Sequence, residues 1–262
     1  MADEAYDALA GVYEWLVPEA LLTPQGSVAA FAGVVEGLEE GSRVLDCAAG
    51  IGLLAVGLAL RGLEVVASDA SAAMIERTRR LAAGHGAELT AAVCPWQDLG
   101  RQGWEGAFDA VFCVGNSLAH AQGRAGRRAA LGAMAGVLRE GGLLVATSRN
   151  WERVRREGSG LEVGDRLAER AGARALVIHA WTVPDGWDEP HHLDVAVAAI
   201  DPEGGVTTRG ERLRLWPFRH RTLDEDLRAA GLAPVSTTYA DDVERYLVTA
   251  RKGAGEGAGA RP

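Results

Sequence analysis

The segment Asp46–Gly52, with the sequence DCAAGIG, joins a short apolar run at Arg43–Cys47 to a helical segment at Leu53–Leu60. Gly50 and Gly52 have no Cβ, so the backbone can turn tightly there and a ligand can come close to the first turn of the helix. A buried strand, a glycine loop and a helix in this order predict the ligand-binding edge of an α/β sheet. A structural turn that binds no ligand is the alternative.

The spacing of Gly50, Gly52 and Ala55 also fits the Gly-x-Gly-x-x-Ala pattern of dinucleotide-binding loops. Asp46 argues against a dinucleotide, because a carboxylate at the end of the first strand would repel a pyrophosphate. The same acid suits a cofactor that carries a cationic amino group. The loop, which includes Ala48, is therefore expected to hold a nucleotide cofactor of that kind.

A second acid, Asp69, follows the apolar run Glu64–Ser68 and precedes a helical segment at Ala72–Ala83. An ionised carboxylate can accept hydrogen bonds from two ribose hydroxyls. The alternative is that Asp69 only caps the helix. Ser71 is already placed to cap it, because its hydroxyl can accept a free backbone N–H of the first turn. We therefore expect Asp69 to bind the ribose.

Apolar and helical segments alternate along the chain up to Asn150, and this alternation predicts a parallel sheet covered by helices on both faces. Further strands are expected at Ala87–Val93, Phe108–Val114 and Leu143–Ser148, with a helix at Arg127–Leu138. After Asn150, alternating apolar and polar residues predict an antiparallel insertion of three strands, then a helix and a closing hairpin. These elements are expected at Ala173–Trp181, His192–Ile200, Val206–Leu215, Thr222–Ala230, Pro234–Thr238 and Arg245–Ala250.

From about Tyr6 to Lys252 the chain resembles the class I S-adenosylmethionine-dependent methyltransferases. The resemblance is carried by Asp46–Gly52, by Asp69-Ala70-Ser71 with Met74, and by the closing hairpin. It implies a Rossmann-like α/β fold with a seven-stranded mixed sheet in the order 3-2-1-4-5-7-6, over which the insertion forms a lid. It also implies that these segments bind S-adenosylmethionine, which leaves as S-adenosylhomocysteine.

A narrower resemblance is to the glycine and glycine/sarcosine N-methyltransferases. It is carried by Tyr6-Asp7 with Tyr13-Glu14-Trp15, and by Phe108–His120, Ser148–Glu152 and Leu213–Arg219. It implies that the aromatic segment with Tyr13 and Trp15 closes over the cofactor. The loop Val114-Gly115-Asn116-Ser117 would touch cofactor and substrate, and Arg149 would bind the acceptor carboxylate, which its fork geometry suits.

The same resemblance suggests roles for other side chains. Trp96, next to Pro95, would stack on the adenine of the cofactor. His120 would line the pocket with Asn116, and it is the candidate base if the acceptor is a hydroxyl. Trp181, at the end of the first insertion strand, is a candidate for contact with the acceptor.

Simpler interpretations exist for several of these residues. Asn116 and Ser117 could cap the next helix, Arg149 could pair with Glu152 on the surface, and Tyr13 and Trp15 could belong to an amphipathic helix. The chain also departs from the glycine N-methyltransferase pattern. Its members have a histidine before the arginine that follows strand five and a tyrosine two residues after it, where this chain has Ser148 and Trp151. In many methyltransferases an acid follows strand three, where Pro95 stands here. These departures put glycine itself in doubt as the acceptor.

Composition narrows the choice of partners. The net charge of −9 disfavours electrostatic binding to nucleic acid or to anionic membranes. The three cysteines lie in apolar runs, and an odd number of buried thiols indicates a reducing compartment. No metal site is expected, because His191-His192 has no third ligand at a suitable spacing. The acidic N-terminus does not resemble a signal peptide, so a cytoplasmic protein is expected.

Together these features predict methyl transfer from S-adenosylmethionine to a small-molecule acceptor, namely the amine nitrogen of an amino acid or a related small carboxylate. The alternatives are an O- or N-methyltransferase of a secondary metabolite, an NAD-dependent reductase and a non-catalytic binding protein. The expected organisation is one domain over 1–252, with an N-terminal helical lid at 1–40, a cofactor-binding core at 41–150 and the insertion at 173–216. A disordered tail is expected at 253–262, and a homo-oligomer is left open.

Overall fold

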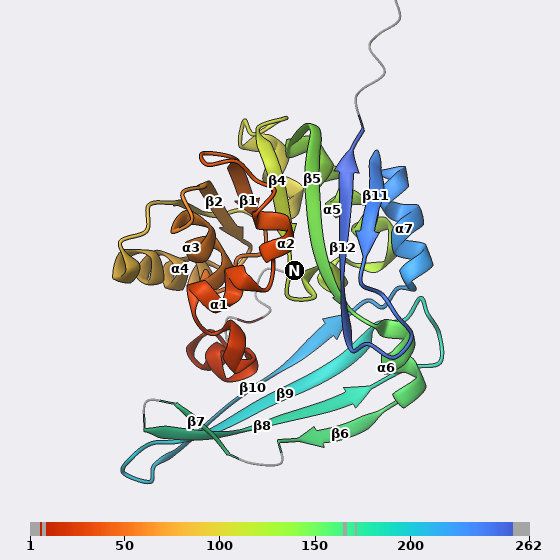
Figure 1. The fold of residues 1–262 in the computed structure, drawn as a ribbon. Coiled ribbons are helices and arrows are strands. Elements are labelled where there is room, and N and C mark those ends of the chain that lie inside the picture. Colours follow the sequence, from red (N-terminus) through yellow and green to blue (C-terminus); the bar gives the residue numbers. More distant parts are fainter. Residues whose placement is uncertain (1–5, 7–8, 165–166, 171, 254–262) are drawn as a thin grey trace, which may run out of the picture.

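The computed structural model describes Tyr6 and residues 9–164, 167–170 and 172–253, and its main feature is a seven-stranded sheet (Figure 1). The strands lie in the order β11-β12-β5-β4-β1-β2-β3. Their bounds are β1 (Arg43–Asp46), β2 (Glu64–Asp69), β3 (Thr90–Val93), β4 (Phe108–Cys113), β5 (Leu138–Arg149), β11 (Leu232–Thr237) and β12 (Arg245–Lys252). Strands β1 to β5 are parallel, and β12 is antiparallel to both of its neighbours. Numbered within this sheet alone, the order is the predicted 3-2-1-4-5-7-6.

Helices cover both faces of this sheet. Val44 and Leu45 are consecutive, fully buried residues of β1, and they belong to two different hydrophobic clusters. The Val44 cluster includes α1 (Pro24–Ala29) and α3 (Leu53–Ala59), and the Leu45 cluster includes α5 (Gly123–Val137) and α7 (His220–Ala229). A sheet buried on both faces needs strands with consecutive apolar residues, which explains Val44-Leu45 in β1 and residues 110–113 in β4.

The remaining helices are short or lie at the edge of the sheet. They are η1 (Ala10–Leu16), η2 (Glu19–Leu21), α2 (Ala32–Val35), α4 (Ala72–His85), η3 (Trp96–Arg101), η4 (Ser117–His120) and α6 (Trp151–Glu157). The segment η1 is a 3-10 helix, and Arg77 of α4 donates to the carbonyl of Ala10 and to Glu14. Arg170 donates to the carbonyls of Glu14 and Val17. Arginines from α4 and from the strand β7 (Ala168–Arg170) therefore hold this segment.

The insertion after β5 forms a second, antiparallel sheet of five strands, two more than predicted. Its strands are β6 (Gly160–Val163), β7 (Ala168–Arg170), β8 (Ala173–Thr182), β9 (His191–Ile200) and β10 (Val206–Leu215). The prediction missed β6 and β7 because both are short, and the four residues of β6 are all exposed, so neither shows an alternating pattern. In Figure 1 this sheet crosses below the seven-stranded sheet, at the end where β5 leads into α6.

The second sheet also contacts the loops at that end. Strand β8 contacts η1, and β10 contacts η4, which follows β4. The N–H of Trp216, just after β10, donates to the carbonyl of Ala119 over 2.7 Å. The carboxyl ends of the parallel strands, where ligands bind in open α/β sheets, are therefore enclosed on this side.

Two further sequence expectations can be compared with the structure. All three cysteines are free and buried, as expected. Within the described part of the chain, no helix combines the length and hydropathy needed to cross a membrane. The expected disordered tail falls almost wholly on residues 254–262, which lie outside the described residues.

Three arginines of α5 converge on Asp226 of α7. Arg127 donates from Nε and from Nη2 to Asp226 Oδ2, over 2.9 and 2.8 Å. Arg124 and Arg128 each donate from Nε to Asp226 Oδ1, over 2.8 and 2.7 Å. Asp226 is fully buried, and Arg127 is 2% exposed with its guanidinium 4.6 Å from the ring centre of Phe218. Burial opposes ionisation of Asp226, but the three guanidinium groups outweigh it and lower the pKa of Asp226.

Replacing Asp226 tests this contact. We expect Asp226→Asn to lower the free energy of unfolding by about 3–5 kcal/mol, because the variant leaves Arg127 buried without a counter-charge. Because the folded-state pKa is lowered, the stabilisation is present above the ordinary pKa of Asp, about 4, and is lost as the pH falls through the folded value. Urea unfolding at neutral and acidic pH measures both effects.

Asp224→Asn is the matched control. Asp224 lies on the same helix and pairs with the exposed Arg228 one turn away. Its loss should be below about 0.5 kcal/mol. Equal losses of unfolding free energy in the two variants would show that the buried cluster stabilises the fold no more than an exposed ion pair does.

Candidate cofactor and acceptor site

The glycine loop after β1 is held against α4. Gly50 and Gly52 both have positive φ angles, 54° and 87°, a conformation that glycine adopts at low cost. A Cβ on Gly52 would lie 2.7 Å from Cγ2 of Thr78, and Thr78 Oγ1 donates to the carbonyl of Gly50 over 2.9 Å. The aromatic ring of Tyr13 lies on the other side, 3.9 Å from where a Cβ on Gly50 would be. The loop is therefore packed too closely at Gly52 for any side chain.

Asp69 connects this loop to the next one. Its Oδ2 accepts the N–H of Gly50 and its Oδ1 accepts the N–H of Ser71, each over 2.9 Å. Ser71 is the N-cap of α4, since its hydroxyl accepts the N–H of Met74 over 3.1 Å. Asp69 therefore does not cap α4 in place of Ser71. Each carboxylate oxygen has about two acceptor positions, so these bonds are compatible with contacts to ribose hydroxyls.

Asp46 is a buried acid behind the loop, 1% exposed. Within the described residues, its Oδ1 has no hydrogen-bond partner. Burial, with a smaller contribution from the negative charge of Asp69, raises the pKa of Asp46 to about 7. A buried carboxylate oxygen without a partner fits a ligand that brings a positive charge, as the amino group of S-adenosylmethionine does.

Other predicted cofactor residues surround the loop. Trp96, the first residue of η3 after Pro95, donates from Nε1 to the carbonyl of Cys47 over 2.7 Å. Met74 is buried with Ile51 and packs beside Tyr13. Ala48 and Ala70 are half-buried in the loops after β1 and β2. These residues are brought together at one corner of the sheet.

Trp15 is placed differently from Tyr13. It packs against the main core, and the guanidinium of Arg170 lies 5.1 Å from its ring centre. Its contacts are therefore with β7 of the second sheet, whereas Tyr13 lies on the glycine loop. A direct contact between Trp15 and the cofactor stays a prediction.

The loop after β4 is fixed to β5. Asn116 has a positive φ of 70°, and its side-chain oxygen accepts the N–H of Arg149 over 3.0 Å instead of capping η4. Gly115 N–H donates to Thr147 Oγ1 over 2.9 Å, and the Ser117 hydroxyl donates to the carbonyl of Val114 over 2.6 Å. The capping alternative is therefore wrong for Asn116, whose side chain joins β4 to β5.

His120 lies at the end of this loop and contacts the N-terminal segment. Its Nε2 is 3.0 Å from the hydroxyl of Tyr6, and the two rings meet edge to face with centres 5.3 Å apart. Tyr6 in turn meets Tyr13 edge to face at 5.7 Å. Burial lowers the pKa of His120 to about 4 and raises the pKa of Tyr6, so both side chains are neutral at physiological pH.

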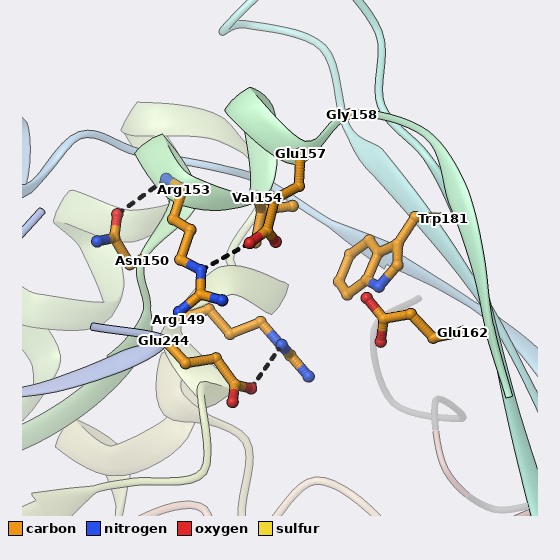
Figure 2. A pocket seen from close by; sticks show the side chains of 9 residues that line it. All are labelled: Arg149, Asn150, Arg153, Val154, Glu157, Gly158, Glu162, Trp181 and Glu244. Atoms are coloured by element: carbon orange, nitrogen blue, oxygen red, sulfur yellow. Dashed lines mark hydrogen bonds and ion pairs between the residues drawn. The ribbon is translucent and has the colours of Figure 1, made fainter. Parts of the chain in front are cut away.

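Arg149 lies at the carboxyl end of β5 and is 15% exposed (Figure 2). Its guanidinium carbon is 5.3 Å from the ring centre of Trp181, and its Nη1 is 3.1 Å from Glu244 Oε1. The expected alternative partner, Glu152, instead accepts the N–H of His220. Glu244 could not be predicted as this partner, because Glu244 lies next to Arg149 only through the pairing of β12 with β5.

Arg149 and Trp181 line a small hollow that is open to solvent. Glu244 and Glu162 also line it, and Figure 2 shows Glu162 beside Trp181, opposite Arg149. The hollow therefore has a cation, an aromatic face and acids around it, which suits a small molecule that carries both a carboxylate and an amino group. Among the described residues, no three His, Cys, Asp or Glu side chains are grouped as metal ligands.

Comparison with known proteins agrees with this geometry. A family model described as a methyltransferase domain matches residues 44–142, which include both loops and β4. The glycine/sarcosine N-methyltransferase of Parasynechococcus marenigrum is 37% identical over 207 residues, which are 78% of this chain and 67% of that protein. The enzyme of the same name from Aphanothece halophytica is 33% identical over 78% of this chain and 71% of that protein.

A solved structure extends the likeness to the whole fold. The CcbJ methyltransferase from Streptomyces caelestis superposes with a TM-score of 0.75 at 21% identity, covering 97% of this chain and all of that one. The superposition with this structure establishes the fold, whereas the sequence relatives establish the family. The cofactor is S-adenosylmethionine, and the protein is an enzyme that transfers its methyl group. The chain therefore belongs to the class I S-adenosylmethionine-dependent methyltransferases, in the group of the glycine and glycine/sarcosine N-methyltransferases.

Proposed function

We propose that the protein methylates the amine nitrogen of an amino acid or a related small carboxylate. The observation that carries this proposal is the position of Arg149. Its guanidinium is largely buried and lines a hollow beside Trp181. Its backbone N–H donates to the side chain of Asn116. A buried arginine fork suits a carboxylate better than an uncharged group. The names of the sequence relatives, which refer to glycine and sarcosine, support the same acceptor class.

The cofactor is proposed to lie on the two loops. Asp46 would take its cationic amino group, Asp69 its ribose hydroxyls, and Tyr13 would cover the glycine loop. When bound, S-adenosylmethionine supplies an electrophilic methyl group on its sulfonium. These residues would hold the cofactor beside the loop after β4, next to which Arg149 would orient the acceptor. Alignment of this kind can supply effective molarities of about 10⁵–10⁸ M.

His120 is proposed to shape the pocket and not to act as a base. Its Nε2 is engaged by the Tyr6 hydroxyl, and its pKa of about 4 makes it a weak proton acceptor. A neutral amine needs no base before it attacks the methyl group, whereas a hydroxyl would. This arrangement therefore favours an amine over a hydroxyl acceptor, and so over O-methylation of a secondary metabolite.

The proposal extends to the rest of the chain. Residues 1–252 would form one methyltransferase domain, in which the N-terminal segment and the second sheet act as lids over the site. The protein would act in the cytoplasm on a small molecule, without nucleic acid, membrane or metal partners. A homo-oligomer is compatible with this function.

A panel of acceptors tests the acceptor class. Release of S-adenosylhomocysteine is measured with amino acids, with the matching amines that lack the carboxylate, and with phenols. We expect amino acids to have the highest kcat/KM, and Arg149→Gln to raise their KM by about 10- to 100-fold, because a charge-assisted hydrogen bond is lost. Arg212→Gln is the control, since Arg212 pairs with Asp194 on the second sheet. Turnover of phenols with inert amino acids would contradict the proposal.

The acid behind the loop predicts a pH dependence of cofactor binding. Asp46 has a pKa of about 7 in the protein without cofactor, and a cation beside it favours the ionised form. Binding below pH 7 must then release a proton, so the Kd should rise by up to about tenfold per unit as the pH falls below 7 and stay level from 7 to 8. Isothermal titration calorimetry in buffers of different ionisation enthalpy measures the Kd and the released proton.

Asp46→Asn should bind more weakly at pH 8 and lose the dependence between pH 6 and 8. Asp194→Asn is the control, because this acid pairs with Arg212 on the second sheet. An unchanged pH profile in the Asp46 variant would show that another group carries the proton.

A further inference from the structure

Arg149 has a second arginine directly opposite it in the sheet. Strand β12 pairs with β5 in antiparallel register, and Arg245 is the partner of Arg149. Paired residues of an antiparallel ladder place their side chains on the same face, and like charges directly opposite one another are destabilising. Two guanidinium groups at this position therefore need an anion between them.

Glu244 provides the anion within the described part of the chain. Its Oε1 lies 3.1 Å from Arg149 Nη1 and 3.7 Å from Arg245 Nε, so a single oxygen serves both arginines. No other carboxylate of the described residues is within ion-pair distance of either guanidinium. Glu244 is 62% exposed, in the turn before β12, and an ion pair this exposed adds little stability. It can be replaced at low cost.

The charge of Arg245 acts on the site. It lowers the pKa of Tyr6 and of Tyr13, against the larger effect of burial, and Tyr13 lies on the glycine loop. The pKa of His179 on β8 is lowered mainly by burial, and the charge of Arg245 lowers it further. The charge of Arg245 therefore reaches side chains of the N-terminal segment and of β8.

We propose that Arg245 and Arg149 together form a two-guanidinium site for the acceptor carboxylate, in which Glu244 is the resident anion that the acceptor displaces. This inference rests on the proposed function, since it adds a residue to the same acceptor site. Two arginines can each donate to a different oxygen of one carboxylate, which fixes both the position and the rotation of the acceptor. Arg245 is thus a specificity-determining residue for acceptors that carry a carboxylate.

The test compares an amino acid acceptor with the amine that lacks its carboxylate. We expect Arg245→Gln to raise the KM of the amino acid by about tenfold with kcat within about twofold, and to lower its kcat/KM relative to the amine by a similar factor. Arg245→Lys, which keeps the charge but not the fork, should recover part of the loss. Affinity for S-adenosylmethionine should change by less than about twofold.

Glu244→Gln should have the opposite effect. Removing the resident anion should lower the KM of the amino acid by about two- to fivefold, because the acceptor no longer displaces a carboxylate. Arg251→Gln is the matched control. Arg251 lies at the far end of the same strand, where it donates to the carbonyl of Gly141, and its loss should leave both KM and kcat unchanged.

The outcomes separate this inference from the proposed function. If Arg149→Gln removes the preference for amino acids and Arg245→Gln does not, the two-guanidinium site is wrong and the proposed function stands. If neither variant changes the preference, both are wrong. Weaker binding of S-adenosylmethionine by Arg245→Gln, or a higher KM in Glu244→Gln, would also overturn the inference, since Arg245 would then serve the cofactor or Glu244 would position Arg149.

Discussion

The carboxylate of Asp69 joins the two loops on which the cofactor edge of the sheet depends. One oxygen accepts the N–H of Gly50 and the other accepts the N–H of Ser71 at the start of α4. Two turns further along α4, Thr78 donates to the carbonyl of Gly50 and fills the space beside Gly52. The loop is thereby closed over Asp46, and the raised pKa of that acid is a consequence of this closure, because burial is its main cause.

The site carries opposite charges at its two ends. Asp46 and Asp69 end neighbouring strands β1 and β2, whereas Arg149 and Arg245 are paired on β5 and β12. A nearby cation disfavours protonation of an amine, so the guanidinium groups would favour the neutral, nucleophilic form of the acceptor. In the proposed arrangement, the acceptor carboxylate points toward the arginines.

The sequence predicted the cofactor loops better than the residues around the acceptor hollow. The glycines of Asp46–Gly52 and the cap at Ser71 are marked by residues that are close together in the chain, so local patterns were sufficient to locate them, although Asp69 and Thr78, which hold the loop, are distant in sequence. The alternative that Arg149 pairs with Glu152 was wrong, because Glu244 comes next to Arg149 when β12 inserts beside β5, which no local pattern encodes. Exposed β6 was missed for a related reason, since pairing with β8 and not apolar alternation makes it a strand.

The helix α6 attaches the second sheet to the core. On the core side, Arg153 donates to the carbonyl of Asp242. On the other side, Arg155 donates to the carbonyls of Pro184 and Gly186, in the turn between β8 and β9. This double attachment sets the distance from β8, with Trp181, to β5. In the proposed site, substitutions on β8, on β6 or in the turn before β12 are therefore expected to act on the acceptor and not on the cofactor loops.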